Sequence, residues 1–129
     1  MIVDSSVLLA MMLSEPESQR IKVAIGEADC KLAAPSYFET SMVLFSRVGP
    51  NGVRDLDLVL ARLSIKVVPF TESQALIARE AFAKFGKGRH PAQLNFGDCM
   101  SYALAKETGE ELLFKGTDFG QTDVTPAPY

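Results

Sequence analysis

The chain has 129 residues, of which 47% are hydrophobic and 22% charged, the composition of an ordinary soluble domain. Thirteen Lys and Arg against sixteen Asp and Glu give a net charge of -3, so overall charge does not attract it to nucleic acid or to an acidic membrane. We expect one domain over residues 1–129, located in the cytoplasm and without a membrane partner, because no apolar run approaches the roughly 20 residues that cross a bilayer. Cys30 and Cys99 have no CxxC spacing and are predicted to be small buried hydrophobes rather than disulfide or zinc ligands.

Short β-leaning runs alternate with longer stretches of helical periodicity. The pattern predicts strands at 1–3, 31–33, 65–69 and 112–114. Helical periodicity covers 7–26, 36–47, 72–85 and 96–108, and a further helical pattern follows a predicted turn at 50–52. Strands that alternate with helices pair in parallel, so this order predicts an α/β fold with a parallel sheet.

Several residues are of the types that begin or end helices. Gly109 is predicted to be a C-cap, and the glycine-rich, basic segment 85–91 is predicted to be an exposed loop. The predicted N-caps are Ser6, Ser36 in a capping box with Glu39, and either Asn95 or Gly97.

Four acidic residues follow strands or open helices, where parallel α/β sheets bind ligands. They are Asp4, Glu39, Asp98 and Asp118. They lie far apart in sequence, so only the fold can bring them together. Carboxylates that converge without Lys or Arg beside them repel one another, and a divalent cation relieves that repulsion. Oxygen ligands without His or Cys select Mg²⁺ or Mn²⁺, which in such sites serves hydrolysis of a phosphodiester.

Each acid also has a purely structural interpretation. Glu39 can complete a capping box, Asp98 can be a first-turn charge on a helix, and Asp118 can be a turn residue. Taken singly, these three favour the structural interpretation. Asp4 is harder to explain in that way, because a carboxylate directly after a buried strand needs a partner to offset its desolvation.

The motifs at 1–6, 35–39, 86–99 and 112–124 make nearly the whole chain resemble the PIN-domain toxins of bacterial VapBC modules. The resemblance implies a three-layer α/β/α, PIN-like fold around a parallel sheet of four to five strands. It also implies a Mg²⁺- or Mn²⁺-dependent endoribonuclease, the toxin of a type II toxin–antitoxin system, with RNA as its substrate. A cognate VapB-like antitoxin would hold it inactive in a hetero-oligomer, and the toxin itself is expected to form a homodimer.

By position, Asp4, Glu39 and Asp98 match the best-defined acids of the family's catalytic metal site. Asp118 is our choice for the fourth acid, with Asp123 in reserve, because family members differ in this segment. The resemblance also places the Ser6 hydroxyl near the metal, although a helix N-cap is the stronger interpretation of that residue.

The segment from Lys84 to His90 is the only dense run of cations, and we predict that it contributes RNA affinity but no chemistry. Apolar side chains of the first helices, such as Leu9, Met12, Leu13, Val43 and Leu44, are expected to serve an interface with a second copy or with the antitoxin. The aromatic residues mostly fall at helical spacing, so packing in the core or a dimer is favoured over base stacking.

Two other functions are compatible with acids at strand ends or with a PIN-like fold. Receiver and dehalogenase-like phosphotransfer domains need a second acid close after the first strand, whereas Asp4 is followed by Ser5 and Ser6. The alternative from another class is a non-catalytic PIN-fold module that only docks a protein partner. A metal-dependent cleavage assay separates it from the enzyme.

Overall fold

The computed structural model describes all 129 residues and has a four-stranded parallel sheet at its centre. The strands are β1 (Ile2–Val3), β2 (Lys31–Ala33), β3 (Lys66–Val68) and β4 (Leu112–Leu113), in the order β3-β2-β1-β4. The predicted α/β class and strand number are confirmed. Strand order reverses at β1, which lies between β2 and β4, and such a reversal is where open parallel sheets place ligands.

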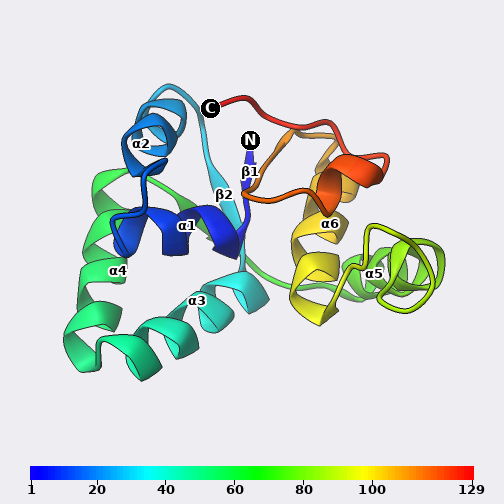
Figure 1. Cartoon of the computed structure of the whole chain (residues 1–129), viewed down its shortest axis with the longest axis horizontal. Coiled ribbons are helices and arrows are strands. Elements are labelled where there is room, and N and C mark those ends of the chain that lie inside the picture. The colour runs from blue at the N-terminus through cyan, green and yellow to red at the C-terminus, as the bar shows by residue number, and fades with distance from the viewer.

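Helices cover both faces of the sheet, as Figure 1 shows. One face carries α1 (Ser5–Met12), α2 (Ser18–Gly26), α3 (Ala34–Arg47) and α4 (Pro50–Arg62), and the other carries α5 (Glu72–Phe85) and α6 (Phe96–Thr108). A short 3₁₀ turn, η1 (Phe119–Gln121), follows β4. No helix is long and apolar enough to cross a membrane.

Alternation along the short strands divides the core into two clusters. Ile2, Ala33 and Leu112 pack with α5 and α6, whereas Val3, Leu32 and Leu113 pack with the helices of the opposite face. Each strand thus sends successive side chains to opposite faces, and both faces are apolar because both are covered. This arrangement gives the three layers expected of the resemblance.

The helical stretch predicted over 7–26 is two helices, not one. The chain leaves α1 through Ser14, whose φ of 56° lies in the left-handed region, and turns before α2 begins at Ser18. Pro16 lies in this turn, and proline cannot donate the backbone hydrogen bond that a continuous helix would need there.

Three predicted helix starts are also wrong. Asp4, not Ser6, is the N-cap of α1, and the Ser6 hydroxyl instead accepts a hydrogen bond from the Lys115 backbone N–H at 3.0 Å. Helix α3 begins at Ala34, two residues before Ser36, because β2 runs directly into it. The predicted turn at 50–52 is the first turn of α4, since a proline at the first helical position loses no hydrogen bond.

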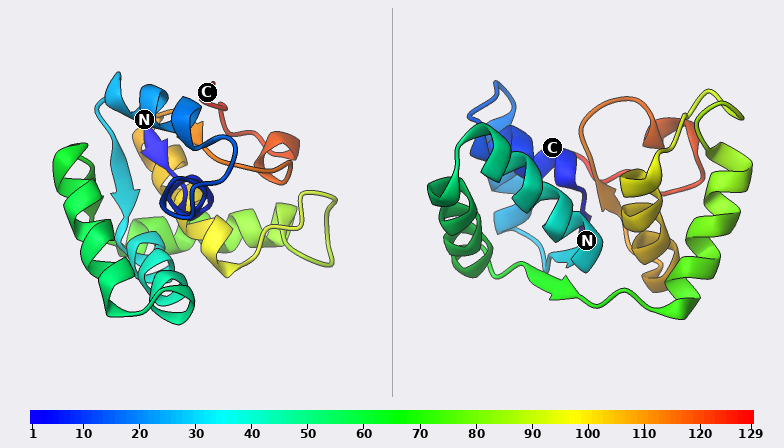
Figure 2. Two further views of the ribbon diagram at one scale, coloured as in Figure 1. Left: turned by 60° about the vertical axis from the view of Figure 1, so that its left-hand side comes forward. Right: turned by 90° about the horizontal axis from the view of Figure 1, so that it is seen from below.

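The signals around α6 are confirmed. Asn95 is its N-cap: its side chain accepts from the Asp98 N–H, and the Asp98 carboxylate accepts from the Asn95 N–H, both at 2.9 Å. Gly109 ends the helix with a φ of 67°, a conformation that favours glycine. The segment between α5 and α6 is the predicted loop, visible in both views of Figure 2.

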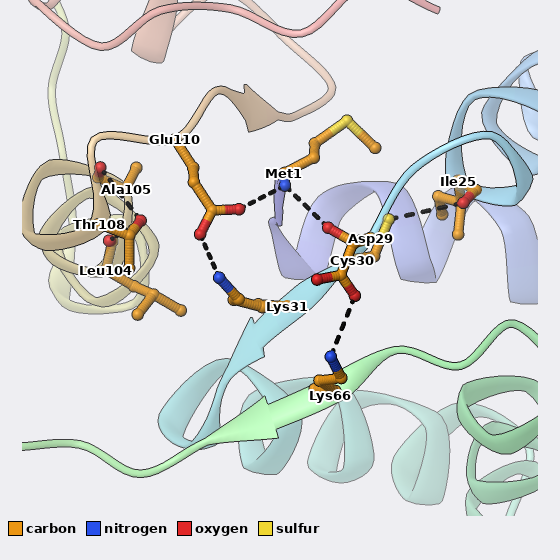
Figure 3. A network of polar contacts seen from close by, with 10 residues as sticks. All are labelled: Met1, Ile25, Asp29, Cys30, Lys31, Lys66, Leu104, Ala105, Thr108 and Glu110. Atoms are coloured by element: carbon orange, nitrogen blue, oxygen red, sulfur yellow. Dashed lines mark hydrogen bonds and ion pairs between the residues drawn. The ribbon is translucent and has the colours of Figure 1, made fainter.

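Charged groups at the amino end of the sheet are paired, as Figure 3 shows. The Glu110 carboxylate accepts from the amino group of Met1 at 2.5 Å and from the Lys31 ammonium, which joins the starts of β1, β2 and β4. Lys66 at the start of β3 forms an ion pair with Asp29 at 3.3 Å. The amino end is therefore neutralised locally.

Candidate active site

The candidate acids lie around the opposite, carboxyl end of the sheet. Asp4 directly follows β1, Glu39 lies in the second turn of the helix that follows β2, and Asp118 lies in the segment after β4. Helix α6 leads into β4 from its C-terminus, so its N-terminus with Asp98 lies at this same end. The topology therefore brings these four acids, which lie far apart in sequence, to the same end of the sheet.

Asp4 is almost completely buried, with 3% of its surface exposed, and both carboxylate oxygens are engaged. Oδ2 accepts from the Ser6 N–H at 2.9 Å, and Oδ1 accepts from the Ser101 hydroxyl at 2.6 Å. Ser101 Oγ also lies 3.1 Å from Ser36 Oγ. Since Ser101 gives its one proton to Asp4, Ser36 must donate to Ser101. Two buried hydroxyls from α3 and α6 thus orient this carboxylate.

Glu39 lies close to both Asp4 and α6. Its Oε2 accepts from the Ser5 hydroxyl at 3.1 Å. On its other side, a Cβ added to Gly97 would lie 2.6 Å from Oε2 and 2.7 Å from Oε1, which no real contact allows. Only glycine at position 97 lets the carboxylate rest against the first turn of α6. Burial raises the pKa of Glu39, the Ser5 hydrogen bond opposes this, and the charge of Asp4 adds to the rise.

Asp98 lies within electrostatic range of the other three acids. Burial raises its pKa to about 6, against the lowering effect of the hydrogen bond from Asn95, and the charges of Asp4, Asp118 and Glu39 add to the rise. The capping box engages one carboxylate oxygen of Asp98. Its role at the helix start is therefore structural, while its electrostatic neighbours are the other three acids.

The two candidates for the fourth acid have different surroundings. Asp118 is exposed, precedes η1 without making a side-chain capping bond, and adds its charge to that around Asp98. Asp123 accepts from the Tyr102 hydroxyl at 2.6 Å and pairs with Lys106 at 3.2 Å. These contacts hold Asp123 against Tyr102 and Lys106 of α6, whereas Asp118 has no such partner, so their surroundings favour Asp118 as the fourth acid.

No ion pair in the structure involves any of the four acids. As the side chains stand, no group of three or more His, Cys, Asp or Glu could hold one metal ion. The chemistry of the donors nevertheless fits a hard divalent cation, because they are carboxylates alone, half-buried or buried in the case of three of them, and without a compensating cation. The contrast with the neutralised amino end of the sheet supports this fit.

Sequence reasoning missed the residues that position these acids: Ser5, Ser36, Ser101 and Gly97. Ser101 carried a usable signal, since it is a hydroxyl within the apolar run 99–105 of α6, where a polar side chain needs a buried partner. Gly97 carried none, because its neighbour Glu39 comes from another helix.

The basic segment from Lys84 to His90 is exposed at Lys84, which lies in the last turn of α5, and at Lys87 and Arg89 in the loop. The Arg89 guanidinium lies over the Phe82 ring at 5.7 Å from its centroid, which holds part of the loop against α5. His90 Nδ1 accepts from the Ala92 N–H at 3.0 Å, so this nitrogen serves the turn. That contact fits the prediction that His90 does no chemistry.

The aromatic residues divide into two groups. Phe85 and Tyr102 are buried in the core as expected. Large exposed aromatics instead lie on α3, α5 and the start of α6: Phe38, Phe45, Phe82 and Phe96, with exposures from 41% to 78%. The side chains expected at an interface are mostly inside, since Leu44 is 1% exposed and Leu9, Met12 and Leu13 pack against the core. The free apolar face of α3 lies beside the expected one around the helix, at Phe38, Met42 and Phe45.

Comparison with known proteins agrees with this architecture. The PIN domain family model matches residues 1–124. Ribonuclease VapC30 of Mycobacterium tuberculosis is 46% identical over 125 residues, covering 96% of this chain and 95% of that protein. The chain belongs to the PIN-domain VapC ribonuclease family. Ribonuclease VapC of Mycolicibacterium smegmatis is also 46% identical over 125 residues, covering 96% of this PIN domain and 97% of that protein.

Solved structures of distant relatives share the fold. M. tuberculosis VapC20, described as a toxin that cleaves the sarcin-ricin loop, superimposes with a TM-score of 0.81 at 16% identity, covering 99% of this PIN domain and 98% of that chain. A toxin–antitoxin complex from Klebsiella pneumoniae gives 0.77 at 14% identity, covering 99% and 97%. At these identities the likeness shows the fold alone.

Proposed function

We propose that this PIN domain is the toxin of a VapBC-type module and hydrolyses RNA phosphodiesters at the carboxyl end of its sheet, using Asp4, Glu39, Asp98 and Asp118. Membership of the VapC ribonuclease family supports RNA as the substrate. The observation that carries the site is geometric: Ser101 and Ser5 hold Asp4 and Glu39 at the carboxyl end of the sheet, Asp98 opens α6 at the same end, and no ion pair engages any of the four acids.

Mg²⁺ or Mn²⁺ is the cofactor that this donor set fits. When bound, such a cation supplies an activated water and neutralises charge on the phosphodiester. The chain's own part is orientation. The hydroxyl of Ser101 holds Asp4 in one rotamer, that of Ser5 holds Glu39 beside it, and the capping box fixes Asp98 at the start of α6. These contacts limit how far the carboxylates must reorganise when a ligand binds.

Asp98→Asn tests the proposal in purified, antitoxin-free protein. Asparagine keeps an oxygen that can accept from the Asn95 N–H, so the helix start survives while the ligand charge is lost. Cleavage of total cellular RNA in Mg²⁺ or Mn²⁺ should fall by orders of magnitude. Asp55→Asn, at an exposed acid of α4, is the matched control and should cleave normally.

Full cleavage by folded Asp98→Asn protein, or cleavage that continues undiminished in excess chelator, would overturn the mechanism. A folded wild-type chain that cleaves no RNA under any of these conditions would leave the alternative of a non-catalytic docking module.

An antitoxin partner is supported by the fold neighbours, several of which are toxin–antitoxin complexes. We also infer a homodimer. Two apolar hollows, one between α5 and α6 and one between α3 and α6, share Phe96 and Met100, so they form one continuous apolar surface from Met42 to Phe82. Exposed apolar surface of this extent marks an interaction site, and a second copy can cover it symmetrically.

A further inference from the structure

A polar pocket adjoins the candidate active site on the side of Asp118. We propose that its two glutamines, Gln93 and Gln121, select the base of one nucleotide next to the scissile phosphate in a single-stranded RNA. The inference rests on the proposed function and adds a part of the substrate to it. The pocket has a volume of about 450 Å³ and lies between the α5–α6 loop and η1. That volume is within the roughly 300–1,000 Å³ of sites that bind small ligands.

The side chains that line this pocket suit a nucleotide. Gln93, Asn95 and Gln121 bring amides, Lys87 brings a cation, and no large apolar side chain is among the lining residues. An amide donates and accepts hydrogen bonds at once, which matches the mixed donors and acceptors on the edge of a base. Single-stranded RNA exposes those edges, and the lysine offers a contact for a phosphate oxygen.

The position of the pocket ties it to the reaction. Asp118 belongs both to its lining and to the group of charges that raises the pKa of Asp98, and Asn95 belongs both to its lining and to the cap of α6. A nucleotide in the pocket therefore lies directly beside the acids. Its neighbour along the strand would present its phosphate to them.

The wall that carries Gln93 is held by the backbone before any ligand arrives. The Gln93 N–H donates to the His90 carbonyl, and the Lys87 N–H donates to the Leu94 carbonyl, both at 3.0 Å. Gln93 has a φ of 52°, a left-handed conformation outside any helix end. Residues held in such conformations concentrate at binding sites. A preformed wall reduces the entropy lost when a base is bound.

The opposite wall is easily rearranged. Gln121 Nε2 donates to the Pro91 carbonyl across the pocket mouth at 3.4 Å, a long hydrogen bond that a base can replace. A protein partner finds no anchor here, since the exposed aromatic residues that anchor protein interfaces lie on the surface from Met42 to Phe82. The chemistry of the pocket therefore favours RNA.

The test uses the full chain carrying Asp98→Asn, which is to bind RNA without cutting it, and a pool of short single-stranded RNAs with randomised sequence. Bound RNA should be enriched in one base at one position. Adding Gln93→Ala and Gln121→Ala should abolish that enrichment and weaken binding of the enriched sequence by about ten- to a hundredfold, with little effect on other sequences. Gln19→Ala on α2 is the matched control and should leave the enrichment unchanged.

In the cleaving chain, the same two substitutions should relax base preference at one position beside the mapped cut while cleavage stays dependent on the metal. Preference that survives the double substitution, or a folded chain that binds no RNA from the pool, overturns the inference. If the two substitutions abolish binding of the cognate antitoxin while RNA preference is unaltered, the pocket binds a protein, and the inference is overturned as well. A different result is that the cleaving chain cuts no RNA even though the enrichment depends on the two glutamines. That result would support the pocket as a base-binding site and would overturn the proposed catalysis.

Discussion

Single residues in this PIN domain have two roles that sequence treats as alternatives. Asp4 caps α1 through Oδ2 and accepts from Ser101 through Oδ1, and Asp98 completes a capping box while it belongs to the acidic group. The structural interpretation is therefore confirmed for Asp98, where it does not compete with the proposed catalytic role, and is wrong for Glu39, which completes no capping box because α3 begins at Ala34. A carboxylate fixed by backbone N–H groups is preorganised, because it keeps the same position before and after a ligand binds.

Gly97→Ala tests the position of the Glu39 carboxylate without changing any charge in the site. The new Cβ would displace the flexible Glu39 carboxylate rather than backbone, so the free energy of unfolding should change by less than about 1 kcal/mol. Cleavage should fall by about 10²-fold, the effect of a misplacement of roughly 1 Å in an active site. Gly26→Ala, where nothing lies within 4 Å, is the control and should keep full activity. Normal cleavage by Gly97→Ala would show that the position of Glu39 does not matter.

At the scale of elements, the segment that follows β4 has two structural roles. Its first part carries Asp118 and η1 toward the acids. Its later part returns along β4, where the Leu112 N–H donates to the Thr125 carbonyl and the Ala127 N–H donates to the Leu112 carbonyl, both at 2.9 Å. Asp123, between these parts, attaches the segment to α6 through Tyr102 and Lys106. The second acid of this segment thus serves stability.

Asp123→Asn should leave cleavage within about twofold of the wild type, whereas Asp118→Asn should abolish it without loss of stability. For Asp123→Asn we expect a loss of about 0.5–1 kcal/mol in the free energy of unfolding, since the ion pair is half-exposed and screened. Paired melting curves and cleavage assays measure both. If Asp123→Asn protein is inactive but normally stable, Asp123 would be the fourth acid of the site and Asp118 would not.

The same contacts predict a dependence on pH. Hydrogen bonds from Tyr102 and then Lys106 lower the pKa of Asp123 against the opposing effect of burial. Its contribution to stability is therefore fully present above the unfolded value of about 3.9 and is lost as pH falls through the lower folded pKa. Between neutral pH and pH 2, wild-type protein should lose more stability than Asp123→Asn in urea titrations. Parallel stability curves would show that Asp123 contributes nothing.

At the scale of the whole molecule, three kinds of surface are distinct but adjoin one another, since Glu39 and Asn95 also line the apolar hollow between α3 and α6. Uncompensated carboxylates lie at the carboxyl end of the sheet, the cations of the α5–α6 loop lie beside them, and the apolar surface runs over α3, α6 and α5. A net charge of -3 conceals this separation. We therefore expect RNA affinity to come from the loop and the proposed self-association to come from the apolar surface.

Lys87→Ala combined with Arg89→Ala should weaken RNA binding equally for all sequences and reduce the slope of log affinity against log salt by ~1.4, since each contact with a single strand accounts for about 0.7. The cleavage rate at saturating enzyme should stay unchanged. The control pair is Lys22→Ala with Arg62→Ala, two exposed cations on α2 and α4. A collapse of the saturated rate would assign the loop to the catalytic machinery instead.

Met42→Glu combined with Phe82→Glu should convert the dimer into a monomer, because each subunit would bring two charges into an apolar interface. Light scattering at micromolar concentration measures this directly. Val23→Glu is matched to Met42→Glu, since both residues are 51% exposed, but it lies on α2 outside this surface and should leave the dimer intact. A wild-type monomer at that concentration would refute the homodimer.

Sequence alone was enough for features that depend on neighbours along the chain. The alternation of strands and helices, an N-cap at Asn95 or Gly97 and the C-cap at Gly109 are local predictions, and the structure confirms them with Asn95 as the N-cap. The motifs shared with VapC toxins led to the family, which the comparisons confirm. Where local signals conflicted, as at Ser36 or Pro50, the helix began where the preceding strand or turn ended, not where the best capping residue lay.

Only the tertiary structure decided how the acids are positioned and which surfaces stay exposed. The hydroxyl on Asp4 comes from a residue 97 positions away, and the glycine against Glu39 belongs to another helix. Tertiary contacts also separated Asp118 from Asp123, two acids that look alike in sequence. The exposed face of α3 carries Met42 and Phe45, the immediate neighbours in sequence of the expected Val43 and Leu44. Burial and electrostatic interaction depend on distance in space, and sequence spacing does not report that distance between residues on different elements.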